Sequence, residues 1–164
     1  MAVWAAGAWG AYLSPEYLAT APDGKTVYVT AATSSKLLVF DAAGSKVAGE
    51  WGLKCDPSGV AVAADGTVYV TGGGVEGMLY KLSPAGKVVG KVAVGHTPMA
   101  PVVSPDGLTV YVLNRFNNSV SAVDAAKMKV RATVPVLREP HAAVLGAGGR
   151  SEERRVGKEC RSRW

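Results

Sequence analysis

The chain of 164 residues is long enough for one domain of ordinary size, and its composition is that of a turn-rich globular protein, with 48% hydrophobic residues, 19% charged residues, 20 glycines and 9 prolines. The formal net charge is +5, but residues 150–164 hold six Lys or Arg and three Glu, so residues 1–149 carry only +2. This low charge gives no support for a nucleic-acid partner. The two cysteines, Cys55 and Cys160, make no disulfide framework. No apolar stretch is long enough to span a bilayer.

Residues 1–14 form an apolar N-terminal segment. The run Ala8-Trp9-Gly10 places small residues where a signal peptidase would cut before Ala11, although no Lys or Arg stands near Met1. We interpret the segment as a shortened signal peptide. The alternative is an apolar edge segment that packs on the first strands.

One pattern recurs three times after this segment. It reads APDGKTVYVT from Ala21, AADGTVYVT from Ala63 and SPDGLTVYVL from Ser104. The Asp-Gly steps are 42 and then 41 residues apart, at Asp23, Asp65 and Asp106. Glycine accepts a positive φ and the Asp side chain can bond to its own turn, so these steps predict hairpin turns better than calcium ligands.

Each copy contains four short alternating segments punctuated by Gly or Pro, which predicts four strands. Four-stranded units of 40–45 residues are typical of β-propeller blades. The segment after each Pro-containing loop is rich in Ala, Gly and Val, as expected of the innermost strand, where blades crowd around the axis. We therefore predict an all-β fold, a partial β-propeller of about three four-stranded blades plus the first strand of a fourth, with bounds near 15–56, 57–97, 98–139 and 140–149.

Residues 104–136, with the two shorter copies, resemble the YVTN-type β-propeller repeat. The shared features are a Pro-Asp-Gly turn, Tyr-Val, an Asn-containing loop, a Val-x-Asp strand end and a Lys-Val strand. The first two copies have Ala31 and Gly72 where the family has Asn, and only the third has Asn114. The resemblance implies a periplasmic, extracellular or cell-surface protein that serves as a binding module, sits beside cytochrome-type domains, or is similar to lactonase and haem-carrying propellers.

The pattern stops inside its fourth unit. Closed propellers have four to eight blades, so the sequence predicts that further blades, and in some relatives a cytochrome-type domain, belong to a longer chain. Residues 150–164 (RSEERRVGKECRSRW) resemble a translated sequencing adapter, and we interpret them as a non-native tail. A basic interaction tail and an amphipathic membrane-surface helix are the competing interpretations.

Candidate ligand-binding residues lie in loops predicted to line the mouth of the central channel. Two positions before the prolines that begin the innermost strands stand a thiol, an imidazole and a guanidinium, and the loops between second and third strands add further candidates. The full set is Cys55, Glu76, His96, Arg115, Phe116, Arg138 and His141.

These residues leave two functions open. The favoured prediction is a binding or scaffold module, not an enzyme, whose partner is an unidentified protein or small molecule and which needs no cofactor. The alternative is a redox propeller, with His96 and His141 as weak candidates to bind haem iron or copper, or a lactonase-like hydrolase that uses Glu76 or Glu139 as a base.

Overall fold

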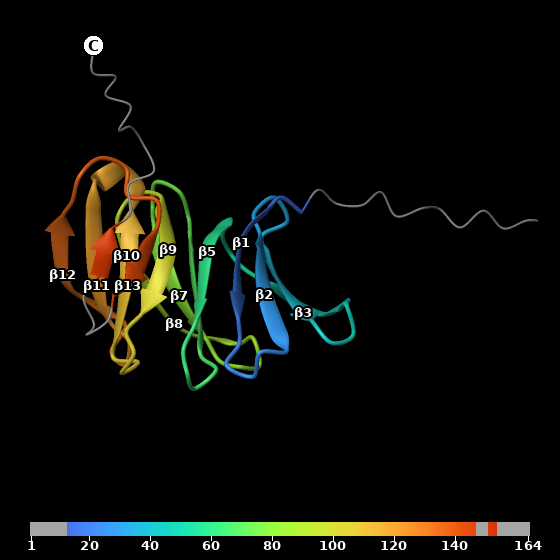
Figure 1. Cartoon of the computed structure of the whole chain (residues 1–164). Coiled ribbons are helices and arrows are strands. Elements are labelled where there is room, and N and C mark those ends of the chain that lie inside the picture. Colours follow the sequence, from blue (N-terminus) through green and yellow to red (C-terminus); the bar gives the residue numbers. More distant parts are fainter. Residues whose placement is uncertain (1–12, 147–150, 154–164) are drawn as a thin grey trace, which may run out of the picture.

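The computed structural model describes residues 13–146 and 151–153, and these residues form antiparallel β-sheets (Figure 1). The first sheet contains β1 (Pro15–Thr20), β2 (Thr26–Ala31), β3 (Lys36–Asp41) and β4 (Lys46–Gly52). The second contains β5 (Pro57–Val62), β6 (Val68–Gly72), β7 (Met78–Leu82) and β8 (Val88–Ala93). The third contains β9 (Pro98–Val103), β10 (Thr109–Asn114), β11 (Ser119–Asp124) and β12 (Lys129–Pro135). The predicted three four-stranded sheets are confirmed. The signal-peptide interpretation concerns residues that, apart from Leu13 and Ser14, lie outside those described.

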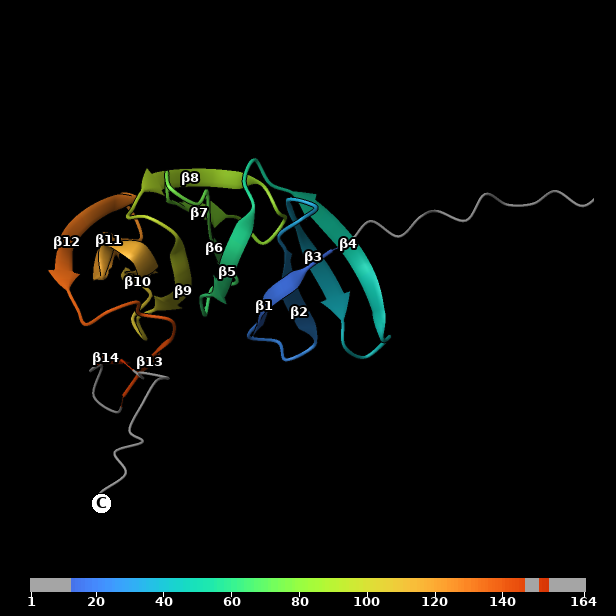
Figure 2. The same cartoon turned by 90° about the horizontal axis from the view of Figure 1, so that it is seen from above.

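The three sheets are arranged as a fan whose inner edge is made by the first strand of each sheet. β5 packs between β1 and β9, while β4, β8 and β12 lie at the periphery (Figure 2). At Gly59 of β5, an added Cβ would lie 2.7 Å from Pro101 Cδ and 2.8 Å from the Ala100 nitrogen, both in β9. A residue without a side chain is therefore required at this point of β5, because the backbone of β9 approaches closely there.

The repeated Asp-Gly steps form the turns predicted for them. The Asp23 carboxylate accepts the backbone N–H groups of Lys25 and Thr26 at 2.8 and 3.0 Å. Asp65 and Asp106 accept one such group each, at 2.9 Å. The following glycines have φ of 65°, 81° and 70°, in the left-handed region that a side chain disfavours. These hydrogen bonds hold the pKa values of Asp23 and Asp65 below the ordinary value, and at Asp106 a hydrogen bond from the Ser104 hydroxyl, together with the backbone bond, lowers the pKa.

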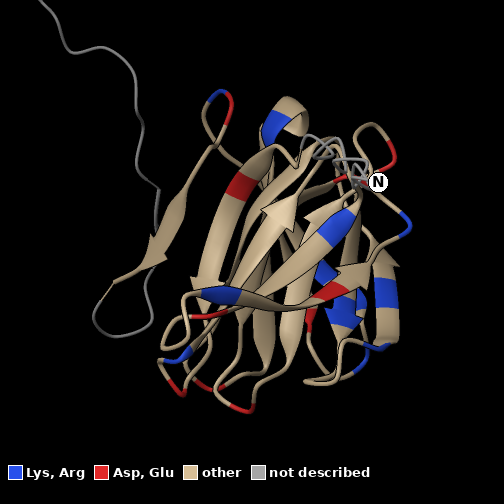
Figure 3. Ribbon diagram, turned by 90° about the vertical axis from the view of Figure 1, so that its right-hand side faces the viewer, with Lys and Arg blue, Asp and Glu red and all other residues tan. Residues whose placement is uncertain are grey.

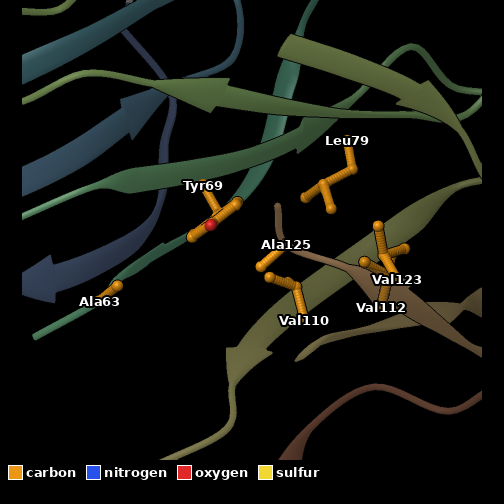
Figure 4. Packing of buried hydrophobic residues seen from close by; sticks show 7 residues of the cluster. All are labelled: Ala63, Tyr69, Leu79, Val110, Val112, Val123 and Ala125. Carbon is orange, nitrogen blue, oxygen red and sulfur yellow. The ribbon is translucent and has the colours of Figure 1, made fainter. Parts of the chain in front are cut away.

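Two apolar clusters join the sheets, one at each junction. The junction between the second and third sheets contains Tyr69 and Leu79 from one side and Val110, Val112 and Val123 from the other (Figure 4). The corresponding cluster between the first and second sheets includes Tyr28, Leu37, Val60, Val68, Val70 and Leu82. Because each cluster takes side chains from two sheets, the sheets stabilise one another.

A fourth unit begins beside the third sheet. β13 (Ala143–Leu145) contacts β9 and pairs with β14 (Ser151–Glu153). β13 is the predicted first strand of a fourth blade, whereas β14 falls in the segment that we interpret as a non-native tail. Free backbone groups of an edge strand can pair with any extended segment, so this pairing requires no particular side chains. Residues 154–164, including Cys160, lie outside those described.

Charged residues lie mainly in loops and near strand ends, and most residues within the strands are uncharged (Figure 3). The part of the chain that the structure describes contains no helix long and apolar enough to cross a membrane.

Candidate functional site

Two sets of loops interlock at one end of the sheets. The linkers before the innermost strands are residues 53–56, 94–97 and 136–142, and the hairpin loops between second and third strands are residues 32–35, 73–77 and 115–118. Backbone hydrogen bonds of 2.7–3.2 Å join each linker to a hairpin loop, as from Leu53 N–H to the Ser35 carbonyl, from Thr97 N–H to the Gly74 carbonyl and from Arg115 N–H to the Thr97 carbonyl. The loop side chains are therefore held by the scaffold.

Four candidate residues form one group around the third sheet, which we call the mouth cluster: His96, Arg115, Phe116 and Glu139. The His96 and Phe116 rings meet nearly edge to face, with centroids 5.2 Å apart and an interplanar angle of 82°. The Arg115 guanidinium lies 5.0 Å from the centroid of the Phe116 ring. Its Nη2 also donates to Glu139 Oε2 at 3.3 Å. The cluster combines a cation, an aromatic face and a compensating carboxylate.

Side-chain amides fix the backbone around the mouth cluster. Asn117 Oδ1 accepts the His96 N–H at 2.5 Å, and Asn118 Oδ1 accepts the Glu139 N–H at 2.8 Å. Thr97 and Glu139 each precede a proline and have φ of 49° and 51°. This backbone conformation is costly for a residue with a side chain, so the surrounding hydrogen bonds must hold it.

The Arg115 side chain is partly buried, with 32% of its surface exposed, whereas the Phe116 residue is 53% exposed. The Arg115 Nε is buried and has no hydrogen-bond partner among the described residues. A buried donor without a partner is unfavourable. The guanidinium is thus only partly satisfied by Glu139, and the open ring beside it offers an apolar surface.

Cys55 and Glu76 meet in a different place, a hollow of about 540 Å³ between the first and second sheets, which we call the thiol hollow. Its lining also includes Ser35, Lys54, Asp56, Gly73, Gly74, Met78 and Tyr80. Burial and the negative charge of Asp56 raise the pKa of the Cys55 thiol, despite a hydrogen bond with Tyr80 that lowers it. A raised pKa keeps the thiol protonated near pH 7, which disfavours both nucleophilic attack and metal ligation.

The other two candidates are not in either group. Arg138 and His141 are exposed. The backbone carbonyl of His141 accepts the Tyr17 hydroxyl at 3.4 Å, which places this linker beside β1 of the first sheet. In residues 13–146 and 151–153, no group of three or more His, Cys, Asp or Glu side chains is arranged to hold a metal ion. The haem or copper alternative stays a prediction.

Asn114 differs from the expectation drawn from the family pattern, because it is not a loop residue. It is the last residue of β10 and is 1% exposed, and both polar atoms of its side-chain amide make hydrogen bonds. Oδ1 accepts the Gly95 N–H at 2.9 Å, and Nδ2 donates to Ser119 Oγ at 3.1 Å and Ser121 Oγ at 2.8 Å. These groups line a second hollow that the sequence analysis did not identify. The available signal was the Ser-Val-Ser alternation of residues 119–121, which places two hydroxyls on one buried face.

No family model matches the sequence, and no curated protein is detectably similar to it. Among solved structures, hydrazine synthase from Kuenenia stuttgartiensis is similar with a TM-score of 0.79 and 21% sequence identity, over 91% of this chain and 44% of that chain. A protein of unknown function from Bacteroides caccae is similar with a TM-score of 0.65 and 12% identity, over 84% of this chain and 51% of that chain. The likeness shows a β-propeller fold alone. The chain spans about half the length of these solved chains.

Proposed function

We propose that this chain is part of an exported or cell-surface β-propeller of the YVTN type that binds a small molecule or a protein at the mouth cluster. The observation that carries the proposal is the assembly of Arg115 over the exposed Phe116 ring, beside His96, on loops tied to two sheets. A rigid β scaffold that presents such loops is a common basis for binding sites.

The chemistry of the mouth cluster suits an anionic partner with an apolar or aromatic part. Arginine and aromatic residues are enriched where binding energy concentrates in interfaces. A carboxylate on the partner can take the place of Glu139 on Arg115, because the existing ion pair is half exposed and long, at 3.3 Å, and therefore contributes little, about 0–1 kcal/mol. Phe116 then covers the apolar part of the partner. Binding thus exchanges one weak internal ion pair for a ligand contact.

The proposed placement in a longer exported protein rests on three further observations. The repeat units resemble the YVTN type, and the chain spans about half the length of the solved propeller-like chains. The apolar first 14 residues agree with export. A binding module exposed outside the cytoplasm would meet its partner directly.

Amide shifts in a two-dimensional NMR titration with benzoate test the binding site, with benzyl alcohol as the uncharged control. We expect benzoate to shift the amides of His96, Arg115 and Phe116, and benzyl alcohol to shift them less. Phe116→Ala and Arg115→Gln should each reduce the affinity for benzoate. Val75→Ala is the matched control, because Val75 is also an exposed apolar residue, at 73% against 53% for Phe116, in the corresponding loop of the second sheet.

Equal shifts with both compounds, or shifts elsewhere on the chain, would contradict the proposal. The same protein is titrated with copper(II) and with haemin. An absorption band that appears on titration and disappears in His96→Ala would favour the redox alternative instead.

A further inference from the structure

The hollow next to Asn114 adjoins the mouth cluster at Asn117 but contains none of its four residues and has a different chemistry. It lies between the second and third sheets, has a volume of about 440 Å³, and is lined by polar and apolar side chains in similar measure. Its polar lining includes Asn117, Ser119, Ser121 and Thr133, and its apolar lining includes Val130 and Pro135. We call it the hydroxyl hollow. Its volume is within the range of small-molecule sites, about 300–1,000 Å³.

We propose that the hydroxyl hollow binds an uncharged polyhydroxylated ligand of about the size of a monosaccharide. The inference goes beyond the proposed function, because the site and the ligand chemistry both differ from those of the mouth cluster.

Asn114 makes this hollow a built site. Its amide uses both Nδ2 hydrogens on Ser119 and Ser121, which therefore act as acceptors toward it. Each serine hydroxyl then has its own hydrogen left to donate. The Thr133 hydroxyl lies 3.5 Å from Ser121 Oγ. Three hydroxyls thus lie on the neighbouring strands β11 and β12, and two of them belong to residues that are at least 94% buried. Because the buried Asn114 amide uses the two serine oxygens as acceptors, the serine hydrogens are available to donate.

The lining explains why the ligand should be uncharged. No Lys, Arg, His, Asp or Glu is among the residues that line the hollow. An ionised ligand would lose hydration without a counter-charge, which is unfavourable. Hydroxyl groups both donate and accept, so they match a ligand whose own hydroxyls do the same. Val130 and Pro135 provide surface for the C–H groups of a sugar ring.

The polar lining is not a requirement of the fold. By strand register, Ser119 and Ser121 occupy the positions held by Met78 and Tyr80 in the second sheet. Asn114 likewise corresponds to Gly72. The first junction therefore packs without this network, and the network is a specific property of the second junction.

An NMR titration of the full chain tests the proposal, with D-glucose, D-galactose and D-mannose at millimolar concentrations as probes. D-glucuronate and D-glucosamine are the charged probes of the same ring size. We expect at least one neutral sugar to shift the amides of Ser119, Ser121 and Thr133, and the charged sugars to bind more weakly. The Phe116 amide should not move, which separates this result from the benzoate titration. The His96 amide does not discriminate, because Asn117 accepts its N–H and also lines the hollow.

Two variants locate the binding. Thr133→Val removes one exposed hydroxyl and should weaken binding about 2- to 10-fold, the effect of one hydrogen bond. Ala93→Leu adds volume from β8, whose Ala93 lines the hollow, and should weaken binding more than 10-fold by occupying the space. Thr109→Val, the same change at the other end of the third sheet, is the matched control and should leave the affinity unchanged.

The proposal is overturned if none of the three neutral sugars shifts the named amides, if neither Thr133→Val nor Ala93→Leu weakens the shifts, or if glucuronate binds as well as the neutral sugars. A hollow that holds only water would give the first of these results.

Discussion

The two junctions between sheets differ in which side supplies the large residue. At the first junction, Trp51 of the first sheet packs on Gly86 of the second, where an added Cβ would lie 2.5 Å from the indole ring. At the second junction, Gly90 of the second sheet faces Met128 of the third, with a corresponding distance of 2.8 Å. Gly86 and Met128 hold the same place in their turns, two residues before Val88 and Val130. The large residue therefore belongs to the earlier sheet at the first junction and to the later sheet at the second junction, and the glycine belongs to the second sheet in both cases.

The same exchange occurs at the mouth end. Cys55 of the first linker faces Gly72, where an added Cβ would lie 2.8 Å from the thiol sulfur. In the next linker the glycine is Gly95, and it faces Asn114 across 2.5 Å to Cγ. At both places a glycine of one element thus faces a larger residue of the neighbouring one, although the order of the two along the chain differs between the junctions. This freedom permits one junction to carry a thiol and the other a hydroxyl network.

The largest expected effect tests whether the apolar centres of the junctions are equivalent. Leu37 and Leu79 hold the same register position in successive sheets, and both are 0% exposed. Leu37→Ala and Leu79→Ala should each lower the free energy of unfolding by about 3 kcal/mol, because each removes a buried side chain and leaves a cavity. Val120 is their counterpart in the third sheet, and it is only half-buried. Val120→Ala should lower the free energy by about 1 kcal/mol. Urea denaturation measures all three, and a much smaller loss at Leu37 than at Leu79 would show that the first junction is less well packed.

The next prediction concerns the Trp51 contact. Gly86 has a φ of 80° and its Cβ position is filled by the Trp51 ring, whereas Gly24 has a φ of 65° and open space around it. Gly24→Ala should lower the free energy of unfolding by about 1 kcal/mol from backbone strain alone. Gly86→Ala adds overpacking and should lower it by about 2–3 kcal/mol. Trp51→Leu in the Gly86→Ala background should recover part of the loss, and an equal effect of the two glycine substitutions would count against the contact.

A smaller effect is expected at the hydroxyl network. Asn114→Ala leaves the Gly95 N–H without its acceptor and should lower the free energy of unfolding by about 2 kcal/mol. It should also accelerate hydrogen exchange at the Gly95 amide. Asn117→Ala is the matched control, since Asn117 is exposed and accepts the neighbouring His96 N–H. Its cost should be about 0.5 kcal/mol. Equal costs would mean that the buried amide adds nothing specific to the second junction.

The comparison also shows which features the sequence could predict. Three units in phase predict three four-stranded sheets, and the Asp-Gly steps predict their turns, because both depend on near neighbours in the chain. The pairing of Trp51 with Gly86, or of Gly95 with Asn114, depends on how successive sheets pack, which periodicity does not describe. Sequence reasoning named His96, Arg115 and Phe116 as loop residues. It did not predict that Arg115 pairs with Glu139 and covers Phe116, because these contacts follow from side-chain conformation.

The smallest expected effect concerns the corner after the third strand. By register, Val123 of the third sheet corresponds to Leu82 of the second, so Asp124 corresponds to Ser83. The Asp124 carboxylate accepts the Lys127 and Ala126 N–H groups at 2.9 and 3.0 Å, and Arg131 Nη2 donates to it at 2.6 Å. These bonds lower the pKa of Asp124 to about 2. The unfolded chain has a pKa of about 3.9, so the carboxylate stabilises the fold above about pH 4, and this contribution is lost as the pH falls toward 2.

Asp124→Asn should therefore lower the urea midpoint at pH 6 and reduce the further decrease between pH 4 and pH 2. Arg131→Met removes only the side-chain donor, so it should give an intermediate loss at pH 6 and retain part of the acid dependence. The remaining acid dependence in Asp124→Asn comes from Asp23, Asp65 and Asp106, whose pKa values are also lowered. An unchanged difference between the midpoints at pH 4 and pH 2 would show that Asp124 does not distinguish the third sheet from the second. A reduced difference would show that one corner of the repeat is closed by the neutral Ser83 hydroxyl, which accepts the Lys87 N–H at 3.3 Å, and another by an ionised hydrogen-bonded turn.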